Sequence, residues 1–344
     1  MTEQNNLCIM ETAPGYLVAI GASAGGFNAV FELVSHLRPE TDAAYLIVLH
    51  LSSRSIGAYL AHRIQDHTKL KSIVAMDGMP LQKGHIYVAQ PNHHLTVSKN
   101  LIRIGNGPAE NRWRPSIDVL FRSAAVHYTN RSIGIILTGL FNDGTAGMSA
   151  IKRCGGNTIV QDPNEAEYPE LPLSVLNAME VGHCIPLGEM ANAIDMILAK
   201  PEEPQNQPPP DLSAEVDLYE RIGTDIRAQK QIGEYTPYTC PECGGVLFRH
   251  DQDSILKFKC HTGHSYTVRD LLKEQSSELE ASIWVAVRSL EQRKDLLLSL
   301  GEKYARSGIN QFADDYHQKA EKLEQHIRHL KAILSSDLDL PMED

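Results

Sequence analysis

The stretch that decides the fold is YLVAIGASAGGFNAVFELVSHL, at residues 16–37. Its first part is an apolar run that ends in the small residues GASAGG at 21–26. Its second part repeats apolar residues at helical spacing over 27–37. A short apolar strand, a tight turn and an amphipathic helix in this order are typical of a βαβ unit. The segment therefore predicts a strand of a parallel sheet and a helix that covers it.

Similar short apolar runs occur further along the chain. AAYLIVLH (43–50), SIGIILTG (132–139) and NTIVQD (157–162) have the length of buried strands, and TAGMSAIKRCG (145–155) has helical spacing. Buried strands that alternate with amphipathic helices predict an α/β fold with a doubly wound parallel sheet, covered on both faces. KGHIYVAQPNHHLTV (83–97) is expected to form an inserted hairpin, because Pro91-Asn92 favours a turn.

The segment KPEEPQNQPPPDLS, at residues 200–213, is the clearest domain boundary. Its prolines and its lack of periodic apolar residues predict an extended linker that joins no core. The division predicted for the whole chain is an N-terminal tail at 1–15, an α/β domain at 16–199, the linker at 200–213, a small Cys/His module with a preceding helix at 214–268, a helical hairpin at 269–336 and an acidic tail at 337–344.

Composition and charge exclude several classes of function. The 344-residue chain has a net charge of −11, whereas non-specific nucleic-acid binding and binding to anionic membranes need a basic surface. No run approaches the length of a transmembrane helix, and the first residues lack the pattern of a signal peptide. Three of the six cysteines are isolated and three are clustered, which indicates metal binding in a reducing compartment. We expect a cytoplasmic protein with no membrane insertion.

Polar residues follow three of the predicted strands. Ser23 ends the first strand, His50 ends the second, and Asp143 lies in the loop LFNDGTAG at 140–147. Because ligands bind at the carboxyl ends of the strands of an open parallel sheet, these residues are expected to meet there. A hydroxyl nucleophile needs a base to take its proton and a carboxylate to orient the base. The three residues are therefore a candidate Ser-His-Asp triad.

The turn around Ser23 fits this chemistry. Gly21-Ala22-Ser23-Ala24-Gly25 is a Gly-x-Ser-x-Gly turn between a strand and a helix, which exposes the hydroxyl and directs backbone amides at a developing oxyanion. The competing interpretation is a phosphate-binding loop of a nucleotide-binding domain. That loop needs glycine at its third position, where this chain has Ser23.

The module after the linker contains a candidate metal site. Cys240-x-x-Cys243 is followed by Cys260, with His261 and His264 as the alternatives for a fourth ligand. Thiolate and imidazole ligands at this spacing predict a closed, structural zinc site in a small zinc-ribbon-like module. Beyond it, two apolar stripes separated by residues 307–310 predict an antiparallel helical hairpin, whose stripes either pack on each other or bind a partner.

Six stretches give the first part of the chain a specific family resemblance. In chain order they are IGASAGG (20–26), VLH (48–50), VAQPNHHL (88–95), NRWRPSIDVLF (111–121), ILTGLFNDGTAGM (136–148) and the Gln161-Asp162-Pro163 strand end. The sequence from residue 16 to about 198 thereby resembles the catalytic domain of the chemotaxis protein-glutamate methylesterases, the CheB type.

The resemblance implies an activity and a set of roles. The family hydrolyses glutamyl methyl esters on chemoreceptors, releases methanol, and in some members deamidates glutamines. It implies Ser23 as nucleophile, His50 as general base and Asp143 as the residue that orients His50, with no cofactor for catalysis. We expect support for the oxyanion from the start of the helix and from the glycine-rich loop, at Ala24, Gly25, Gly139, Asn142 and Gly144.

The sequence departs from the family pattern in three places. Ala24 stands where threonine is usual, which removes a hydroxyl near the oxyanion, and Leu140 stands where methionine is usual. Only about fifteen residues precede the first strand, so we expect a standalone form without a receiver domain. Related C-terminal modules carry a Gly-His pair like Gly263-His264, which favours His264 as the fourth metal ligand.

Three functions remain in competition at this stage. The first is a methylesterase that acts on a methylated chemoreceptor-type protein, with a methyltransferase or another chemotaxis protein as a further partner. The second is a hydrolase of the same mechanism for another ester or amide, and the third is a non-catalytic signalling scaffold. Because the linker should separate the two parts, we expect chelation to unfold or loosen the residues after the linker and to spare the activity of the isolated residues 1–200.

Overall fold

The computed structural model describes residues 13–50, 57–200, 204–220, 233–252 and 255–335. The chain divides into two compact units, Met1–Thr267 and Val268–Asp344. The residues on both sides of the expected linker thus belong to one unit. The N-terminal tail up to residue 12 and the predicted acidic tail lie outside the described residues.

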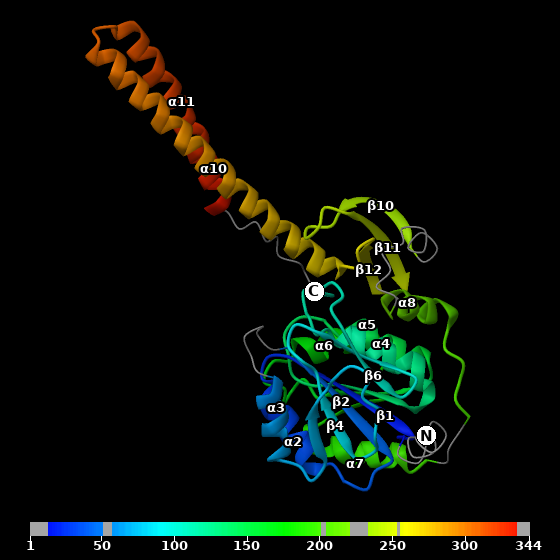
Figure 1. The fold of residues 1–344 in the computed structure, drawn as a ribbon. Helices are drawn as coiled ribbons and strands as arrows, with labels where there is room; N and C mark the ends of the chain where they lie inside the picture. The colour runs from blue at the N-terminus through cyan, green and yellow to red at the C-terminus, as the bar shows by residue number, and fades with distance from the viewer. Residues whose placement is uncertain (1–12, 51–56, 201–203, 221–232, 253–254, 336–344) are drawn as a thin grey trace. The chain divides into compact units, whose positions relative to one another are not determined.

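The first unit contains a seven-stranded sheet in which every pair of neighbouring strands is parallel (Figure 1). This confirms the predicted doubly wound sheet. Because β1 pairs with β2 on one side and with β7 on the other, the strand order reverses at β1, where ligands bind in such sheets. Across the sheet the strands are β3 (Lys71–Val74), β4 (His85–Val88), β2 (Ala43–Leu49), β1 (Tyr16–Ala22), β7 (Ser132–Ile136), β8 (Asn157–Gln161) and β9 (His183–Ile185).

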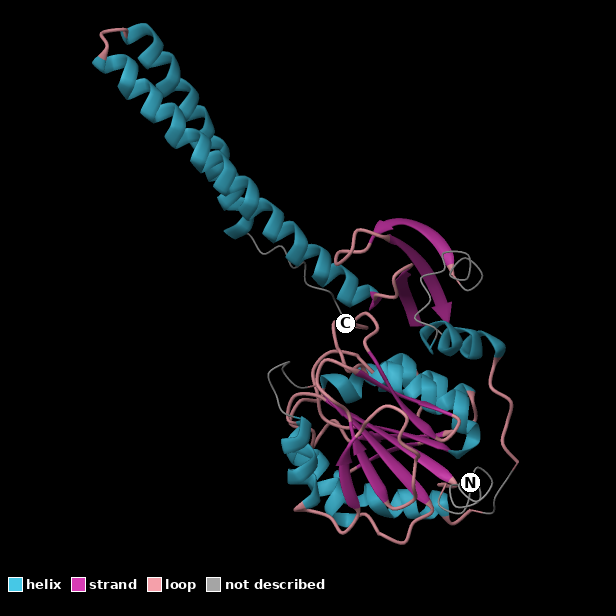
Figure 2. Ribbon diagram, in the orientation of Figure 1, coloured by secondary structure: helices cyan, strands magenta, loops and turns pink. Residues whose placement is uncertain are grey.

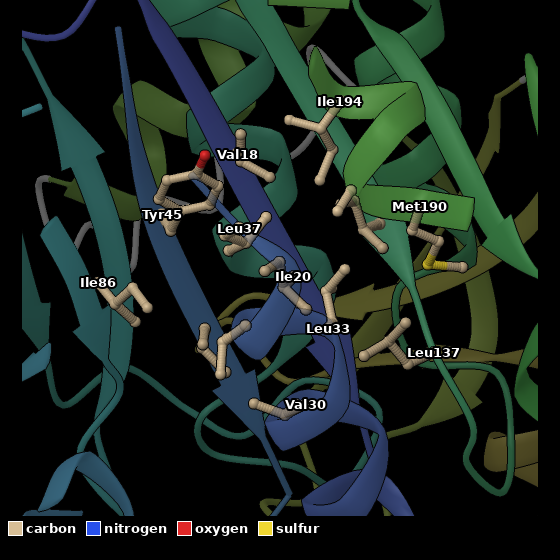
Figure 3. Packing of buried hydrophobic residues seen from close by; sticks show 14 of the residues in the cluster. Val18, Ile20, Val30, Leu33, Leu37, Tyr45, Ile86, Leu137, Met190 and Ile194 are labelled. Atoms are coloured by element: carbon tan, nitrogen blue, oxygen red, sulfur yellow. The ribbon is translucent and has the colours of Figure 1, made fainter. Parts of the chain in front are cut away.

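Helices cover both faces of this sheet, as Figure 2 shows. Alternate side chains of β1 point to opposite faces, so that Val18 and Ile20 join one buried cluster and Leu17 joins the other. The first cluster, drawn in part in Figure 3, includes residues of α2 (Gly26–His36), α3 (Gly57–Gln65) and α7 (Leu187–Leu198). The second includes residues of α4 (Ile117–Tyr128), α5 (Thr145–Arg153) and α6 (Glu170–Ala178). A short 3₁₀ helix, η1 (Thr129–Arg131), follows α4.

The expected hairpin at 83–97 is wrong. Its first half is β4 of the parallel sheet, and its second half, β5 (His94–Ser98), pairs instead with β6 (Leu101–Gly105) in a separate antiparallel sheet. The turn of this hairpin is Lys99-Asn100, where both residues have positive φ, at 48° and 64°. Two positive φ angles in a two-residue loop are the geometry that matches the twist of hairpin strands.

The expected linker ends earlier than residue 213. Helix α8 (Pro210–Glu220) begins inside it, and Leu212 is buried in the second cluster with residues of α4 and α5. Proline is tolerated in the first turn of a helix, where its missing amide hydrogen has no intrahelical acceptor. A proline-rich composition therefore did not prevent this segment from joining the core.

The Cys/His module is a four-stranded antiparallel sheet within the first unit, which we call the ribbon. Its strands are β10 (Glu234–Thr239), β11 (Val246–Gln252), β12 (Ile255–Cys260) and β13 (Ser265–Thr267), paired in that order. Lys257 and Lys259 alternate with Phe258 along β12, so the two lysines lie on one face of the strand and the phenylalanine on the other.

The second unit is the predicted antiparallel hairpin of two helices, α10 (Val268–Arg306) and α11 (Asn310–Ser335). Their apolar stripes contact each other at the buried residues Val287, Ala320 and Ile327, and Lys294 pairs with Glu324 at 2.8 Å. The turn contains Gly308, with φ of 75°. In the part of the chain that the structure describes, no helix combines the length and the apolar character needed to span a membrane.

Candidate active site

Ser23 lies directly after the central strand β1. Its backbone amide donates to the carbonyl of Thr138 at 3.1 Å, which continues the pairing of β1 with β7 beyond the ends of the strands. The chain at Gly139 then passes so close that a Cβ added there would lie 2.7 Å from the Ser23 Cβ. Glycine at 139 is therefore required by this close approach, which fixes the backbone next to the serine hydroxyl.

The imidazole of His50 lies between Ser23 and Asp143. Its Nδ1 is 3.1 Å from the Ser23 Oγ, and its Nε2 is 2.8 Å from the Asp143 Oδ2. Since the carboxylate accepts, Nε2 carries the hydrogen, and Nδ1 is left as the acceptor for the serine hydroxyl. The ring of Trp113 stacks on the imidazole at 4.0 Å, and the His50 side chain is only 1% exposed. The three residues predicted from the strand ends are thus brought together.

The Asp143 carboxylate is buried and accepts hydrogen bonds from several groups besides His50. The Ile117 amide donates at 2.7 Å, the Asp118 amide at 3.2 Å and the Ser116 hydroxyl at 2.8 Å, all at the start of α4. Burial raises the pKa of Asp143, but the hydrogen bond and charge of His50 and the bonds at the start of α4 outweigh it and leave that pKa below its ordinary value. The carboxylate is held in its ionised form at a helix N-terminus, which favours an anion.

Two residues around Asp143 were not singled out by sequence reasoning. Asn111 donates from Nδ2 to Asp143 Oδ1 at 3.1 Å and to Asp118 Oδ2 at 2.8 Å. Asp118 in turn accepts from the amides of Gly144 at 3.0 Å and Gly147 at 2.6 Å. Both residues lie in NRWRPSIDVLF (111–121), where five polar side chains stand at the junction between a loop and a helix. The polar side chains of this stretch are visible in the sequence, but the sequence does not indicate which of them are buried next to Asp143.

His94 is a second buried histidine beside the site. The amide of Ser116 donates to its Nδ1 at 3.2 Å, so its Nε2 carries the hydrogen and donates to the carbonyl of Pro108 at 2.9 Å. Burial lowers the pKa of His94 to about 4, although the Pro108 carbonyl and nearby carboxylates partly oppose this. His94 is therefore neutral and orients the start of α4.

The residues expected to support the oxyanion differ in whether their backbone amides already donate a hydrogen bond to another group. The Gly139 amide donates to the Tyr168 carbonyl at 2.9 Å, and the Gly144 amide is taken by Asp118. The Asn142 side chain donates to the Thr267 hydroxyl at 3.0 Å. Ala24 and Gly25 lie at the start of α2, where Gly25 caps the helix with φ of 71°. The amides next to Ser23 are therefore the better placed donors.

The four residues predicted as metal ligands converge in the ribbon. The ligand atoms of Cys240, Cys243, Cys260 and His264 all lie within 4.8 Å of one another, and His261 is not part of this group. The sulfur atoms of Cys243 and Cys260 are 3.8 Å apart. A tetrahedral ion with metal–sulfur bonds of about 2.3 Å separates its sulfur ligands by about 3.8 Å. The group can therefore bind a metal ion.

The orientation of His264 also fits a metal ligand. Its Nδ1 faces the Cys240 and Cys260 sulfur atoms at 3.6 Å and 3.5 Å, while its Nε2 lies 2.9 Å from the Glu242 carboxylate. A ligating histidine commonly donates its other ring hydrogen to a carboxylate, which fixes the ring and raises its basicity. Because the protein supplies all four ligands of a tetrahedral ion, no coordination position stays open for water or substrate, as expected of a structural site.

Comparison with known proteins agrees with this geometry. The family model for the CheB methylesterase matches residues 18–194, which include the whole parallel sheet except for the first two residues of β1. The match covers more than half of the chain. The chain therefore belongs to the CheB methylesterase family.

The individual relatives match the same region. A Leptospira interrogans relative is 36% identical over 175 residues, which are 51% of this chain and 90% of that protein. A protein-glutamate methylesterase/protein-glutamine glutaminase of Hydrogenovibrio crunogenus is 31% identical over 188 residues, and one of Yersinia pestis is 40% identical over 154 residues. The chain spans 50% of the Hydrogenovibrio protein and 43% of the Yersinia protein.

The fold also has a counterpart among solved structures. The crystal structure of the Thermotoga maritima CheB methylesterase catalytic domain superposes with a TM-score of 0.50 at 25% sequence identity. The superposition covers 53% of this chain and 97% of the Thermotoga domain. The ribbon and the helical hairpin are thus additions to a catalytic domain of ordinary extent.

Proposed function

We propose that this chain hydrolyses glutamyl methyl esters on a protein substrate, with Ser23, His50 and Asp143 as a catalytic triad. The observation that carries the proposal is the position of the His50 imidazole, 3.1 Å from the Ser23 hydroxyl and 2.8 Å from the buried Asp143 carboxylate. The relatives of this chain are named for methyl ester hydrolysis and glutamine deamidation, which supports hydrolysis as the class of reaction.

The proposed reaction has two steps. The Ser23 Oγ attacks the ester carbonyl while the His50 Nδ1 takes the hydroxyl proton, and Asp143 stabilises the imidazolium that forms. The tetrahedral intermediate collapses when His50 returns the proton to the methoxy oxygen, which leaves as methanol. A water molecule, deprotonated by His50, then attacks the acyl-serine and releases the glutamate carboxylate and Ser23.

The negative oxygen of the tetrahedral intermediates needs hydrogen-bond donors. We assign this role to the amides of Ala24 and Gly25, because the amides of Gly139 and Gly144 already donate to other acceptors. The start of α2 adds the positive end of a helix dipole to these donors. Loss of one such donor typically costs about 3 kcal/mol of transition-state stabilisation.

A second candidate function is deamidation of glutamine by the same residues. It is favoured by the names of the Hydrogenovibrio and Yersinia relatives, which join a glutaminase to the methylesterase. The acyl-serine is identical in the two reactions, and only the leaving group changes from methanol to ammonia. A scaffold without catalysis is disfavoured, because it would not need the ordered His50 between Ser23 and Asp143.

The proposal extends to the metal, the partners and the location. We infer a structural zinc ion at Cys240, Cys243, Cys260 and His264, because three thiolates and an imidazole suit zinc. The proposed substrate is a methylated chemoreceptor-type protein. A methyltransferase or another chemotaxis protein is proposed as a further partner, and the cytoplasm as the location of the protein. These inferences rest on family membership and on the donor set of the site.

Methanol release from a methylated receptor tests the proposal. We expect Ser23→Ala to lower turnover by about 10⁴-fold or more, because members of a triad act as a unit. Asp143→Asn should also lower turnover strongly, because it changes the tautomer of His50. Ser35→Ala, which removes an exposed hydroxyl on α2, is the matched control and should leave turnover unchanged. Turnover near the wild-type rate in Ser23→Ala would place the chemistry elsewhere.

A further inference from the structure

A cluster of six charged residues is buried between α4, α8 and the ribbon. Three are acids and three are bases, so their charges balance, and their side chains are between 1% and 14% exposed. The residues are Glu110, Asp118 and Arg122 from the region of α4, Glu215 from α8, and Lys257 and Lys259 from β12.

The ion pairs cross from the ribbon to the α/β part. Lys257 Nζ lies 3.2 Å from Asp118 Oδ2 and 3.7 Å from Glu110 Oε1. Lys259 Nζ lies 3.5 Å from Glu215 Oε1, and Arg122 pairs with both glutamates. Removing one partner of a buried ion pair is strongly destabilising, because an uncompensated charge stays in a medium of low dielectric. The two lysines of the ribbon are therefore part of the charge balance of the catalytic domain.

This cluster reaches the proposed catalytic carboxylate through two hydrogen bonds. Lys257 contacts Asp118, and Asn111 donates one amide group to both Asp118 and Asp143. Burial raises the pKa of Asp118, and Asp143 nearby raises it further, whereas the charge of Lys257 lowers it. Among the described residues, Lys257 is the only cation of the ribbon that contacts Asp118. Its charge therefore offsets the repulsion between the neighbouring carboxylates of Asp118 and Asp143.

The ribbon also fixes the two loops that flank Asp143. The Asn111 amide donates to the Ser265 carbonyl at 2.9 Å, and Glu110 and Ser265 form an isolated parallel bridge. On the other side, the Asn142 side chain donates to the Thr267 hydroxyl at 3.0 Å. The first of these loops also carries Trp113, which stacks on His50. Both of these loops therefore have a contact on β13.

We propose that the ribbon is a positioning part of the active site, in which Lys257 neutralises Asp118 so that Asn111 and Asp143 keep the geometry that orients His50. The inference rests on the proposed triad. It makes Lys257 a positioning residue and not a catalytic one, since it contacts neither Ser23 nor His50 in the hydrogen bonds of the site.

The pH dependence of turnover follows from the charges around the two carboxylates. Asp118 and Asp143 face Lys257 from β12, Arg122 from α4, Glu110 from the preceding turn, and the histidines His50 and His94. Loss of the Lys257 charge makes this region more negative and so favours protonation of the base. The acidic limb of the kcat/KM profile should then move to higher pH, because a charge in a protein interior is only partly screened from its neighbours.

The test compares charge-removing and charge-keeping variants of the full chain in the methanol-release assay. We expect Lys257→Met to lower kcat between about tenfold and about a hundredfold with little change in KM, because a small displacement of a positioned base is costly. The acidic limb should move as stated. Lys257→Arg should restore most of kcat and the original pH profile. Arg249→Met, which removes an exposed cation from β11, is the matched control and should change neither.

The outcomes separate this inference from the proposed function. Circular dichroism first establishes that each variant is folded, and Lys257→Gln takes the place of Lys257→Met where the methionine variant is not. If the wild type releases no methanol, or Ser23→Ala is as active as the wild type, the triad itself fails. If the triad assay succeeds and the uncharged variant keeps the wild-type kcat and pH profile, only the role of Lys257 and the ribbon is overturned.

Discussion

Among single residues, Asp143 illustrates how a buried charge is stabilised where the proposed reaction needs it. An isolated carboxylate in the protein interior is highly unfavourable unless its oxygens are hydrogen-bonded. Here the donors are the imidazole of His50, the side chains of Asn111 and Ser116, and two amides at the start of α4. They fix the direction of both oxygens, so the carboxylate can hold the imidazole in one tautomer.

His94 gives a prediction about stability against pH. Its pKa in the folded protein is about 4, below the ordinary value of about 6.5, because it is buried in its neutral form. The unfolded chain therefore binds this proton first as the pH falls. Stability that is fully present above pH 6.5 should be lost progressively between about pH 6.5 and pH 4, by about 3 kcal/mol in total.

Urea unfolding at a series of pH values measures this effect. We expect His94→Gln to unfold more easily than the wild type near neutral pH but to lose about 3 kcal/mol less between pH 6.5 and pH 4. His93→Gln, at the half-buried neighbouring histidine, is the matched control and should keep the wild-type slope. Equal slopes for the wild type and His94→Gln would mean that His94 is not held neutral.

The three residues of the proposed triad could be predicted from the sequence because they follow the predicted strands. Ser23 and His50 follow apolar runs whose burial fixes where each strand stops, and Asp143 follows the third such run at a glycine-rich loop. Asn111 and Asp118 could not be assigned in this way. Their contacts depend on how a loop folds against α4 and β7, and no periodicity in the loop carries that information.

Among the elements, the ribbon combines a candidate metal site with two buried lysines on one face of β12. The small ribbon has few large buried apolar or aromatic side chains among its described residues, namely Leu247, Phe248, Phe258 and Tyr266. A metal ion at Cys240, Cys243, Cys260 and His264 would therefore supply much of its folding free energy. Because the same strand carries Lys257 and ends at Cys260, loss of the metal should disturb the ion pairs with the α/β part.

Removal of the metal from the full chain should therefore lower activity. We expect a chelator to release about one zinc ion per chain, to remove hydrogen-exchange protection from β10–β13 and to lower methanol release by about tenfold or more. Cys260→Ser should behave like the chelated protein. Cys184→Ser, at an exposed cysteine outside the metal group, is the matched control and should keep both the metal and the activity.

An unchanged rate in the chelated protein, with protection of the ribbon strands lost, would contradict the coupling. That outcome would agree with the expectation drawn from the sequence, in which an extended linker separates the two parts. The sequence could not show the ion pairs between them, because Lys257 and Lys259 have the spacing of an exposed face of a strand. Only the tertiary structure shows that α4 and α8 cover that face.

For the whole molecule, the predicted order of parts agrees with the structure, but one predicted separation does not. The parallel sheet, the Cys/His module and the helical hairpin occur in the expected order, and the hairpin forms its own unit from Val268 onward. The α/β part and the ribbon instead form a single compact unit, joined by α8. The local pattern predicted each part well, whereas the buried contacts between parts depend on side chains far apart in the sequence.

The central claim is that Ser23, activated by His50 and Asp143, is the nucleophile of a methylesterase. Reaction with a fluorophosphonate, followed by mass spectrometry and by methanol-release assays on the same samples, tests it most directly. The account predicts about one label per chain, on Ser23, with activity lost in proportion to labelling and with labelling much slower in His50→Ala. A label on another residue, or full methanol release from protein labelled at Ser23, would contradict it.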